Sequence, residues 1–229
     1  MTETVPLTGQ RLGLLRPIEH SPRTASSSDP AAPSTPLLLP PLAPVAMSTR
    51  RTLDFDLETV AAGYADPEWV PSTITAWAYS WGDDVEVDAL PVRFMYDRPA
   101  RRRFLRPLLD AIQEADVLTG HNVLRFDLPV LQADLMRLGL PSLPARLVQD
   151  TIRLPRSKGF KKGQDNLAVL MDVRAEKLPL NFEQWAAAYA EPGLETVKNR
   201  VAGDVRQHML IRGEMRARGW LVAPRVWSP

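Results

Sequence analysis

Two carboxylic acids that stand two positions apart, Asp56 and Glu58, are the residues of this chain best suited to chemistry. They lie in the segment Phe55-Asp56-Leu57-Glu58-Thr59, which follows the β-prone residues Arg51-Thr52-Leu53. Because successive side chains of a strand point to opposite faces, both acids share one face, with Cα atoms about 6–7 Å apart. The apolar residues beside them then point into a core. Two such carboxylates repel each other unless a cation lies between them, and their hard oxygens suit Mg²⁺ or Mn²⁺. A strand with a hydrated acidic face is the alternative for this pentapeptide alone.

Further acids follow in two downstream segments. One is Gly120-His121-Asn122-Val123-Leu124-Arg125-Phe126-Asp127, and the other is Arg200-Val201-Ala202-Gly203-Asp204-Val205, which lies inside a helical pattern. Together with the first segment they resemble the three motifs of the DEDD (DnaQ-like) 3′–5′ exonuclease superfamily, which has a ribonuclease H-like fold. The spacing between Asn122 and Asp127 is most similar to the proofreading exonuclease domain of family-B DNA polymerases. The resemblance covers residues 51–221.

The resemblance implies a site for two divalent ions, Mg²⁺ or Mn²⁺. Asp56 would bridge both ions, Glu58 and Asp204 would complete the tighter site, and Asp127 would help at the second ion. Two ions about 3.5–4 Å apart activate a water and stabilise charge on the leaving oxygen of a phosphodiester. Each of the two later acids, taken singly, has a simpler explanation. Asp127 could be a carboxylate that is stabilised by a helix N-terminus, and Asp204 could be a hydrated residue on a helix surface.

The third motif departs from the family pattern. Relatives carry a tyrosine four residues before the final Asp, or a histidine five residues before it, and that group positions the attacking water. Here these positions hold Arg200 and Asn199, neither of which is a neutral general base. Arg200 is expected to pair with the acids or to hold a phosphate. His208, one helical turn beyond Asp204, is a candidate catalytic substitute. Three outcomes remain open if His208 does not act. The metal ions alone activate the water, another residue takes the place of the missing tyrosine or histidine, or the enzyme is slow or silent.

Several residues are candidates for contacts with nucleic acid. By the resemblance, Asn122 shapes the cleft near the 3′ end, and Leu57 and Thr59 match positions that contact the terminal nucleotide. Phe126 could stack on a base, although core packing explains it equally well. His121 is expected to be a hydrogen-bonded structural histidine at a strand end.

Local basic segments would supply the contacts to a phosphate backbone. The segment Lys158-Gly159-Phe160-Lys161-Lys162-Gly163 places Lys158, Lys161 and Lys162 around an aromatic residue in a glycine-flanked loop suited to a single strand. The run Arg101-Arg102-Arg103 with Arg106 is interpreted as ordinary solvated surface.

Composition bounds the class of protein. The chain has 229 residues, of which 45% are hydrophobic, enough for one domain with a sizeable core. The net charge of +1 gives no global attraction to nucleic acid, so such binding must come from local patches. The absence of cysteine excludes disulfides and thiolate metal sites and is typical of a cytoplasmic protein. The sequence contains no run of about 18 apolar residues, so it predicts no membrane-spanning helix.

The first 46 residues differ in kind, because they hold nine of the 22 prolines and none of the aromatic residues. Such a segment cannot bury enough apolar surface to offset its ordering entropy, so residues 1–46 are predicted to be a disordered tail. The residues from Met47 onward also fit a translation start, which would make the tail a mis-assigned extension. A flexible tether to a partner is the alternative. Residues 47–229 are predicted to form the DnaQ-like domain.

The order of expected elements predicts the fold class. Strands are expected over 51–57, 72–81 and 85–94, then a helix over 99–115, in which Pro107 marks a kink or a new start. A strand over 116–119, a helix over 126–138 and a last strand over 146–149 follow, and then helices over 166–172, 182–189 and 194–218. This order predicts an α/β fold with a mixed five-stranded sheet flanked by helices.

The sequence therefore predicts a metal-dependent 3′–5′ exonuclease that acts on single-stranded DNA. Its partners would be single-stranded 3′ ends and, in trans, a DNA polymerase or a replication or repair complex. One alternative is an exoribonuclease of the same fold, since nothing in the sequence separates the two sugars. The other is a catalytically silent nucleic-acid-binding module that kept the acids and lost the water-positioning group.

Overall fold

The computed structural model describes residues 50–59, 73–82, 84–154, 159–174 and 178–229. These residues all belong to one compact unit. The predictions for residues 1–46 and for Lys158 lie outside the described residues and stay predictions.

Six strands, five α-helices and one short 3₁₀ helix make up the described part of the chain. The strands are β1 (Thr52–Thr59), β2 (Ile74–Ser80), β3 (Val85–Ala89), β4 (Val117–Gly120), β5 (Arg146–Asp150) and β6 (Arg225–Trp227). The helices are η1 (Val92–Phe94), α1 (Arg98–Glu114), α2 (Asp127–Leu138), α3 (Gln164–Met171), α4 (Phe182–Ala190) and α5 (Glu195–Ala217).

The strands form one mixed sheet in the order β3-β2-β1-β4-β5-β6. The central strand β1 runs antiparallel to β2 and parallel to β4, and β4 runs parallel to β5. The predicted α/β class is confirmed, and this arrangement is consistent with a ribonuclease H-like fold. The prediction of five strands is wrong by one, because β6 pairs antiparallel with β5 at the sheet edge. With only three residues, β6 is too short to show an alternating pattern.

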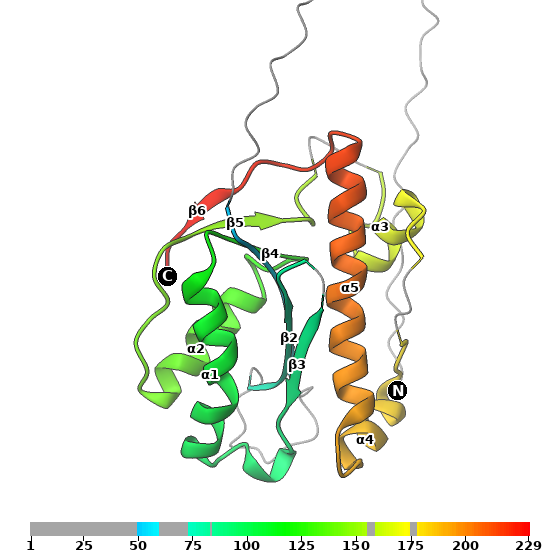
Figure 1. Cartoon of the computed structure of the whole chain (residues 1–229). Helices are drawn as coiled ribbons and strands as arrows, with labels where there is room; N and C mark the ends of the chain where they lie inside the picture. The colour runs from blue at the N-terminus through cyan, green and yellow to red at the C-terminus, as the bar shows by residue number, and fades with distance from the viewer. Residues whose placement is uncertain (1–49, 60–72, 83, 155–158, 175–177) are drawn as a thin grey trace, which may run out of the picture. The chain divides into compact units, whose positions relative to one another are not determined.

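Helices cover both faces of the sheet (Figure 1): α1 and α2 lie on one face, and α5 lies on the other with α3 and α4 beside it. On the first face, Leu53, Phe55 and Leu57 of β1 are buried in a core with α1 and α2, as their alternation predicts. On the second face, the small residues Ala76 and Ala78 of β2 pack against valines of α5. The acidic face of β1 therefore looks toward α5.

Two prolines act differently from the sequence expectation. The third strand ends at Ala89, and Pro91 precedes η1 instead of continuing a strand to residue 94. Pro107 neither kinks α1 into two helices nor starts a new one, since α1 runs through it. Pro107 is exposed, so water can bond the carbonyl group that its missing N–H leaves free.

The arginine run at the start of α1 is more than solvated surface, which corrects the prediction for it. Arg101 is only 7% exposed and forms an ion pair with Asp134 of α2, which is fully buried. Asp134 also accepts a hydrogen bond from the backbone N–H of Ile74 at 3.1 Å, and Arg102 donates to the carbonyl of Leu138. These contacts tie α1, α2 and β2 together.

Candidate functional site

Three of the predicted acids converge in space. Asp56 and Glu58 of β1 and Asp204 of α5 each offer a carboxylate oxygen, and these three oxygens lie within 4.8 Å of one another. Asp56 and Glu58 are half-buried, and Asp204 is 5% exposed. One cation could contact all three carboxylates at this spacing.

The fourth predicted acid, Asp127, lies against the backbone of β1. It is the first residue of α2, is 2% exposed, and accepts a hydrogen bond from the backbone N–H of Leu57 at 3.1 Å. This contact is possible because β4 pairs with β1 only from Thr52 to Asp54. Beyond Asp54 the backbone of β1 is open on that side, and the N-terminus of α2 occupies the space.

The charges of these acids act strongly on one another. Burial raises the pKa of Asp56 well above its usual range, and the charges of Asp127, Asp204 and Glu58 raise it further, against a smaller opposing effect of Arg200. Burial also raises the pKa of Asp127 to about 8, although two backbone hydrogen bonds act in the opposite direction. A divalent cation would relieve the repulsion, so this all-oxygen set of donors fits Mg²⁺ or Mn²⁺.

Arg200 pairs with the acid cluster, one of the two roles expected for it. Its guanidinium Nη1 donates to Oδ2 of Asp204, one helical turn further along α5. Its side chain is 17% exposed. Position 200 therefore holds a cation that competes for a candidate metal ligand.

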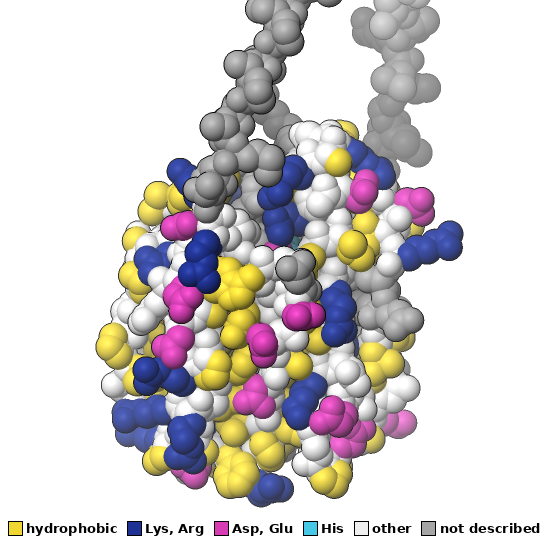
Figure 2. All heavy atoms as spheres, viewed as in Figure 1, with side chains coloured by type: hydrophobic (Ala, Val, Ile, Leu, Met, Phe, Trp, Pro, Cys, Tyr) yellow, Lys and Arg dark blue, Asp and Glu magenta, His cyan; other side chains and the backbone are white. Residues whose placement is uncertain are grey.

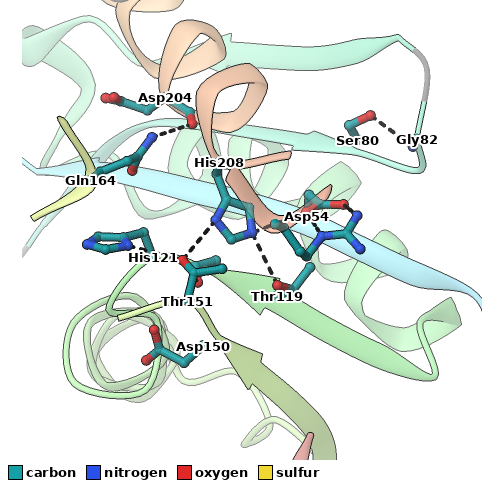
Figure 3. A network of polar contacts seen from close by, with 12 residues as sticks. Asp54, Ser80, Gly82, Thr119, His121, Asp150, Thr151, Gln164, Asp204 and His208 are labelled. Atoms are coloured by element: carbon teal, nitrogen blue, oxygen red, sulfur yellow. Dashed lines mark hydrogen bonds and ion pairs between the residues drawn. The ribbon is translucent and has the colours of Figure 1, made fainter. Parts of the chain in front are cut away.

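His208 bonds residues outside the acid cluster, and the carboxylate of Asp204 points away from its imidazole ring (Figure 3). Its Nε2 lies 3.1 Å from Thr119 Oγ1 and 3.2 Å from Asp54 Oδ1, and its Nδ1 lies 3.3 Å from Thr151 Oγ1. The ring is 3% exposed. With both nitrogens engaged in a buried network, His208 is not placed to position a water at the cluster.

Asp54 is a buried polar residue that the sequence analysis missed. Both of its oxygens accept hydrogen bonds from Arg212 of α5, at 2.8 and 2.7 Å. Burial by itself would raise the pKa of Asp54, but His208 and Arg212 outweigh it and lower the pKa. The signal was present, because Asp54 shares its strand face with Asp56, and Arg212 shares its helix face with Asp204 at intervals of four residues.

The loop before Asp127 is fixed by a carboxylate at the end of β5. Asp150 accepts hydrogen bonds from the backbone N–H groups of Asn122, at 2.8 Å, and Leu124, at 3.1 Å. Asn122 has φ of 65°, a left-handed conformation that asparagine tolerates. His121 Nδ1 lies 3.0 Å from Thr151 Oγ1, in line with a structural histidine. The loop thereby sets the position at which α2 begins.

The other candidates for nucleic-acid contact lie in different environments. Leu57 is 3% exposed in the core, so its side chain cannot reach a nucleotide. Phe126 is 41% exposed directly before α2 and is available for stacking, contrary to the core-packing alternative. Thr59 is half-buried at the end of β1, Lys161 is exposed, and Lys162 is half-buried.

The surface carries no dominant charge on the face shown in Figure 2, where basic and acidic side chains are interspersed with apolar ones. Among the described residues, no helix has both the length and the apolar character needed to cross a bilayer.

Comparisons with known proteins locate the fold. No protein-family model matches the chain, and no curated protein matches it. Among solved structures, the chain is similar to the family B DNA polymerase from the hyperthermophilic archaeon Pyrobaculum calidifontis, with a TM-score of 0.53 and 21% sequence identity. The match covers 73% of this chain and 24% of the polymerase chain, so this chain spans about a quarter of that protein. At this identity the likeness shows the fold alone, an α/β arrangement that also occurs within a DNA polymerase.

Proposed function

We propose that the protein is a metal-dependent 3′–5′ exonuclease of the DEDD (DnaQ-like) superfamily that removes nucleoside monophosphates from single-stranded DNA. The convergence of Asp56, Glu58 and Asp204, with oxygens within 4.8 Å of one another, carries this proposal. The likeness to part of a family B DNA polymerase supports it at the level of fold. Single-stranded 3′ ends are the proposed partner, with a polymerase or a replication or repair complex acting in trans.

The four acids would hold two Mg²⁺ or Mn²⁺ ions. The charges of Asp127, Asp204 and Glu58 all act on Asp56, which suits a carboxylate shared between two ions. Glu58 and Asp204 would hold one ion with it, and Asp127 would help to hold the other. When bound, the ions supply an activated water and stabilise charge on the leaving oxygen.

Residues around the acids would hold the end of the strand. Phe126 is exposed beside Asp127 and would stack on a terminal base. By the family resemblance, Asn122 and Thr59 would lie near the 3′ end of the bound strand. Arg200 lies against Asp204, and once a cation takes that carboxylate its guanidinium is free to bond a phosphate oxygen.

A second candidate function is a silent nucleic-acid-binding module. Two observations favour it: Arg200 stands where relatives carry a water-positioning tyrosine, and both ring nitrogens of His208 are engaged elsewhere. The same fold acting on RNA is the remaining alternative, since the 2′-hydroxyl distinguishes the two substrates.

Digestion of end-labelled strands tests the proposal. Single-stranded DNA and RNA, labelled at either end, would be incubated with the full chain and Mn²⁺ or Mg²⁺. We expect 5′-labelled DNA to shorten stepwise and 3′-labelled DNA to release labelled mononucleotide at once. Chelator and Asp56→Asn should abolish both, whereas Asp84→Asn, an exposed acid outside the cluster, should not. Binding without shortening would refute the exonuclease and support the silent module, and shortening of RNA alone would support the exoribonuclease.

A further inference from the structure

A pocket of about 370 Å³ with a basic lining opens at the carboxyl end of β5. Four basic residues line it, and we call it the basic pocket: Arg125, Arg153, Lys162 and Arg225. Arg125 stands two residues before Asp127, and Arg153 follows the end of β5. Because β1, β4 and β5 are parallel, their carboxyl ends meet at one edge of the sheet, and the pocket and the acids share that edge.

The positive charge of the basic pocket is only partly offset by its surroundings. The one carboxylate in the lining is Asp150, whose oxygens accept backbone hydrogen bonds from Asn122, Leu124 and Ile152, at 2.8, 3.1 and 3.1 Å. Within the described ranges, no ion pair involves any of the four basic side chains. Three guanidinium groups and an ammonium group around one cavity suit a phosphate, which guanidinium binds with two parallel hydrogen bonds.

An apolar pocket of about 300 Å³ adjoins the basic one, since Leu154 lines both. Its lining includes two aromatic side chains that are partly exposed, Phe160 at 39% and Trp220 at 46%. Phe160 stands two residues before Lys162, so one loop contributes to both pockets. Aromatic faces stack on any base, and cations beside them bond the backbone. The two pockets together therefore match the chemistry of one nucleotide within a strand.

We propose that the basic pocket binds a backbone phosphate of the single strand and that the apolar pocket holds a base next to that phosphate. The inference rests on the proposed function, since it names how the same substrate is held away from the acids. The lysine-rich loop was expected to contact nucleic acid from its composition. The structure adds Arg125, Arg153 and Arg225, which come from three other segments of the chain.

Binding measured in chelator tests the inference without cleavage. Fluorescence anisotropy of a labelled short oligothymidylate would be followed for the full chain, for Arg153→Gln/Arg225→Gln, and for the control Arg103→Gln/Arg216→Gln. The control arginines are exposed, line neither pocket and remove the same charge. We expect the pocket variant to bind about tenfold more weakly at low salt, and its slope of log K against log[salt] to shrink by about 0.7 for each phosphate that the variant no longer neutralises. The control should follow the wild type. Equal affinity and slope in the two double variants, or no binding by the wild type, would overturn the inference.

Two further arms identify the ligand. Phe160→Leu should weaken binding about tenfold with an unchanged salt slope, because stacking is removed while the charge stays the same. Inorganic phosphate or thymidine monophosphate should not displace the oligomer at equal phosphate concentration, and displacement by either would overturn the assignment to a strand. A wild type that binds but does not shorten the strand refutes the exonuclease alone. A wild type that shortens it while the pocket variant binds normally refutes this inference alone.

Discussion

The protonation state of the acid cluster determines how the stability of the metal-free protein varies with pH. Burial raises the pKa of Asp127 to about 8 and that of Asp56 well above its usual range. In the unfolded chain both groups would titrate near pKa of about 3.9. Between these values the folded protein binds more protons than the unfolded chain. The free energy of unfolding should therefore fall as the pH rises from about 5 to about 8.

The size of this effect follows from proton linkage. Each carboxyl that is protonated when folded and ionised when unfolded lowers the free energy of unfolding by about 1.4 kcal/mol per pH unit. Asp127 alone would thus contribute at most about 3 kcal/mol over two pH units, and the raised pKa of Asp56 acts in the same direction. Asp54 does not mask the trend. Its pKa is lowered, so its stabilisation is complete above the unfolded-state value and is lost only in acid.

A divalent cation should oppose the trend, because it binds the ionised carboxylates and not the protonated ones. Saturation at a hundred times Kd would stabilise the folded protein by about 2.7 kcal/mol, and most of this gain should appear toward alkaline pH.

Urea denaturation followed by tryptophan fluorescence measures these effects, across the same pH range, in chelator and in Mn²⁺. Asp127→Asn should flatten the metal-free dependence, and Asp84→Asn should leave it unchanged. A metal-free stability that rises from about pH 5 to about pH 8 would refute the reasoning, as would equal stabilisation by Mn²⁺ at every pH.

Three other substitutions have defined outcomes. Arg200→Gln removes a guanidinium that competes with Mn²⁺ for the carboxylate of Asp204, and it should tighten Mn²⁺ binding measured by calorimetry. The control Arg206→Gln changes an exposed arginine of the same helix and should leave Mn²⁺ binding unchanged. Weaker Mn²⁺ binding by Arg200→Gln would contradict the competition. Asp54→Ala leaves the largely buried guanidinium of Arg212 unpaired and should lower the free energy of unfolding in urea by about 3–5 kcal/mol. A decrease below about 1 kcal/mol would contradict a stabilising pair. Gly120→Ala places a Cβ 2.9 Å from the carbonyl oxygen of Phe55 and should destabilise the protein in the same assay by about 1–3 kcal/mol, so an unchanged stability would contradict this close approach.

Much of the fold could be predicted from local pattern. The alternation in β1 correctly assigned its apolar side chains to the core, and glycine and proline marked the end of α2. What failed depended on tertiary structure. The strand β6 is held by its pairing with β5 and has too few residues to be recognised alone. Arg101 resembles the exposed arginines around it until α2 brings Asp134 against it.

In the candidate site, too, local pattern predicted some residues, and tertiary structure determined the others. The acids of β1 and α5 were found because strand and helix periodicity place carboxylates on definite faces. The partners of His208 could not be predicted, because they depend on which residues of α5 lie next to which residues of β1 in the tertiary structure. His208 meets Asp54 there, while Asp204 meets Asp56. The basic pocket draws on four segments of the chain, and only the lysine-rich one has a local signature.

The central claim is that the four acids together hold divalent cations, and a calorimetric titration of the metal-free full chain with Mn²⁺ tests it most directly. We predict two ions per chain for the wild type and for Asp84→Asn, and no measurable binding for Asp56→Asn, because both proposed ions would depend on that carboxylate. Undiminished Mn²⁺ binding by Asp56→Asn, or no binding by the wild type, would contradict the claim.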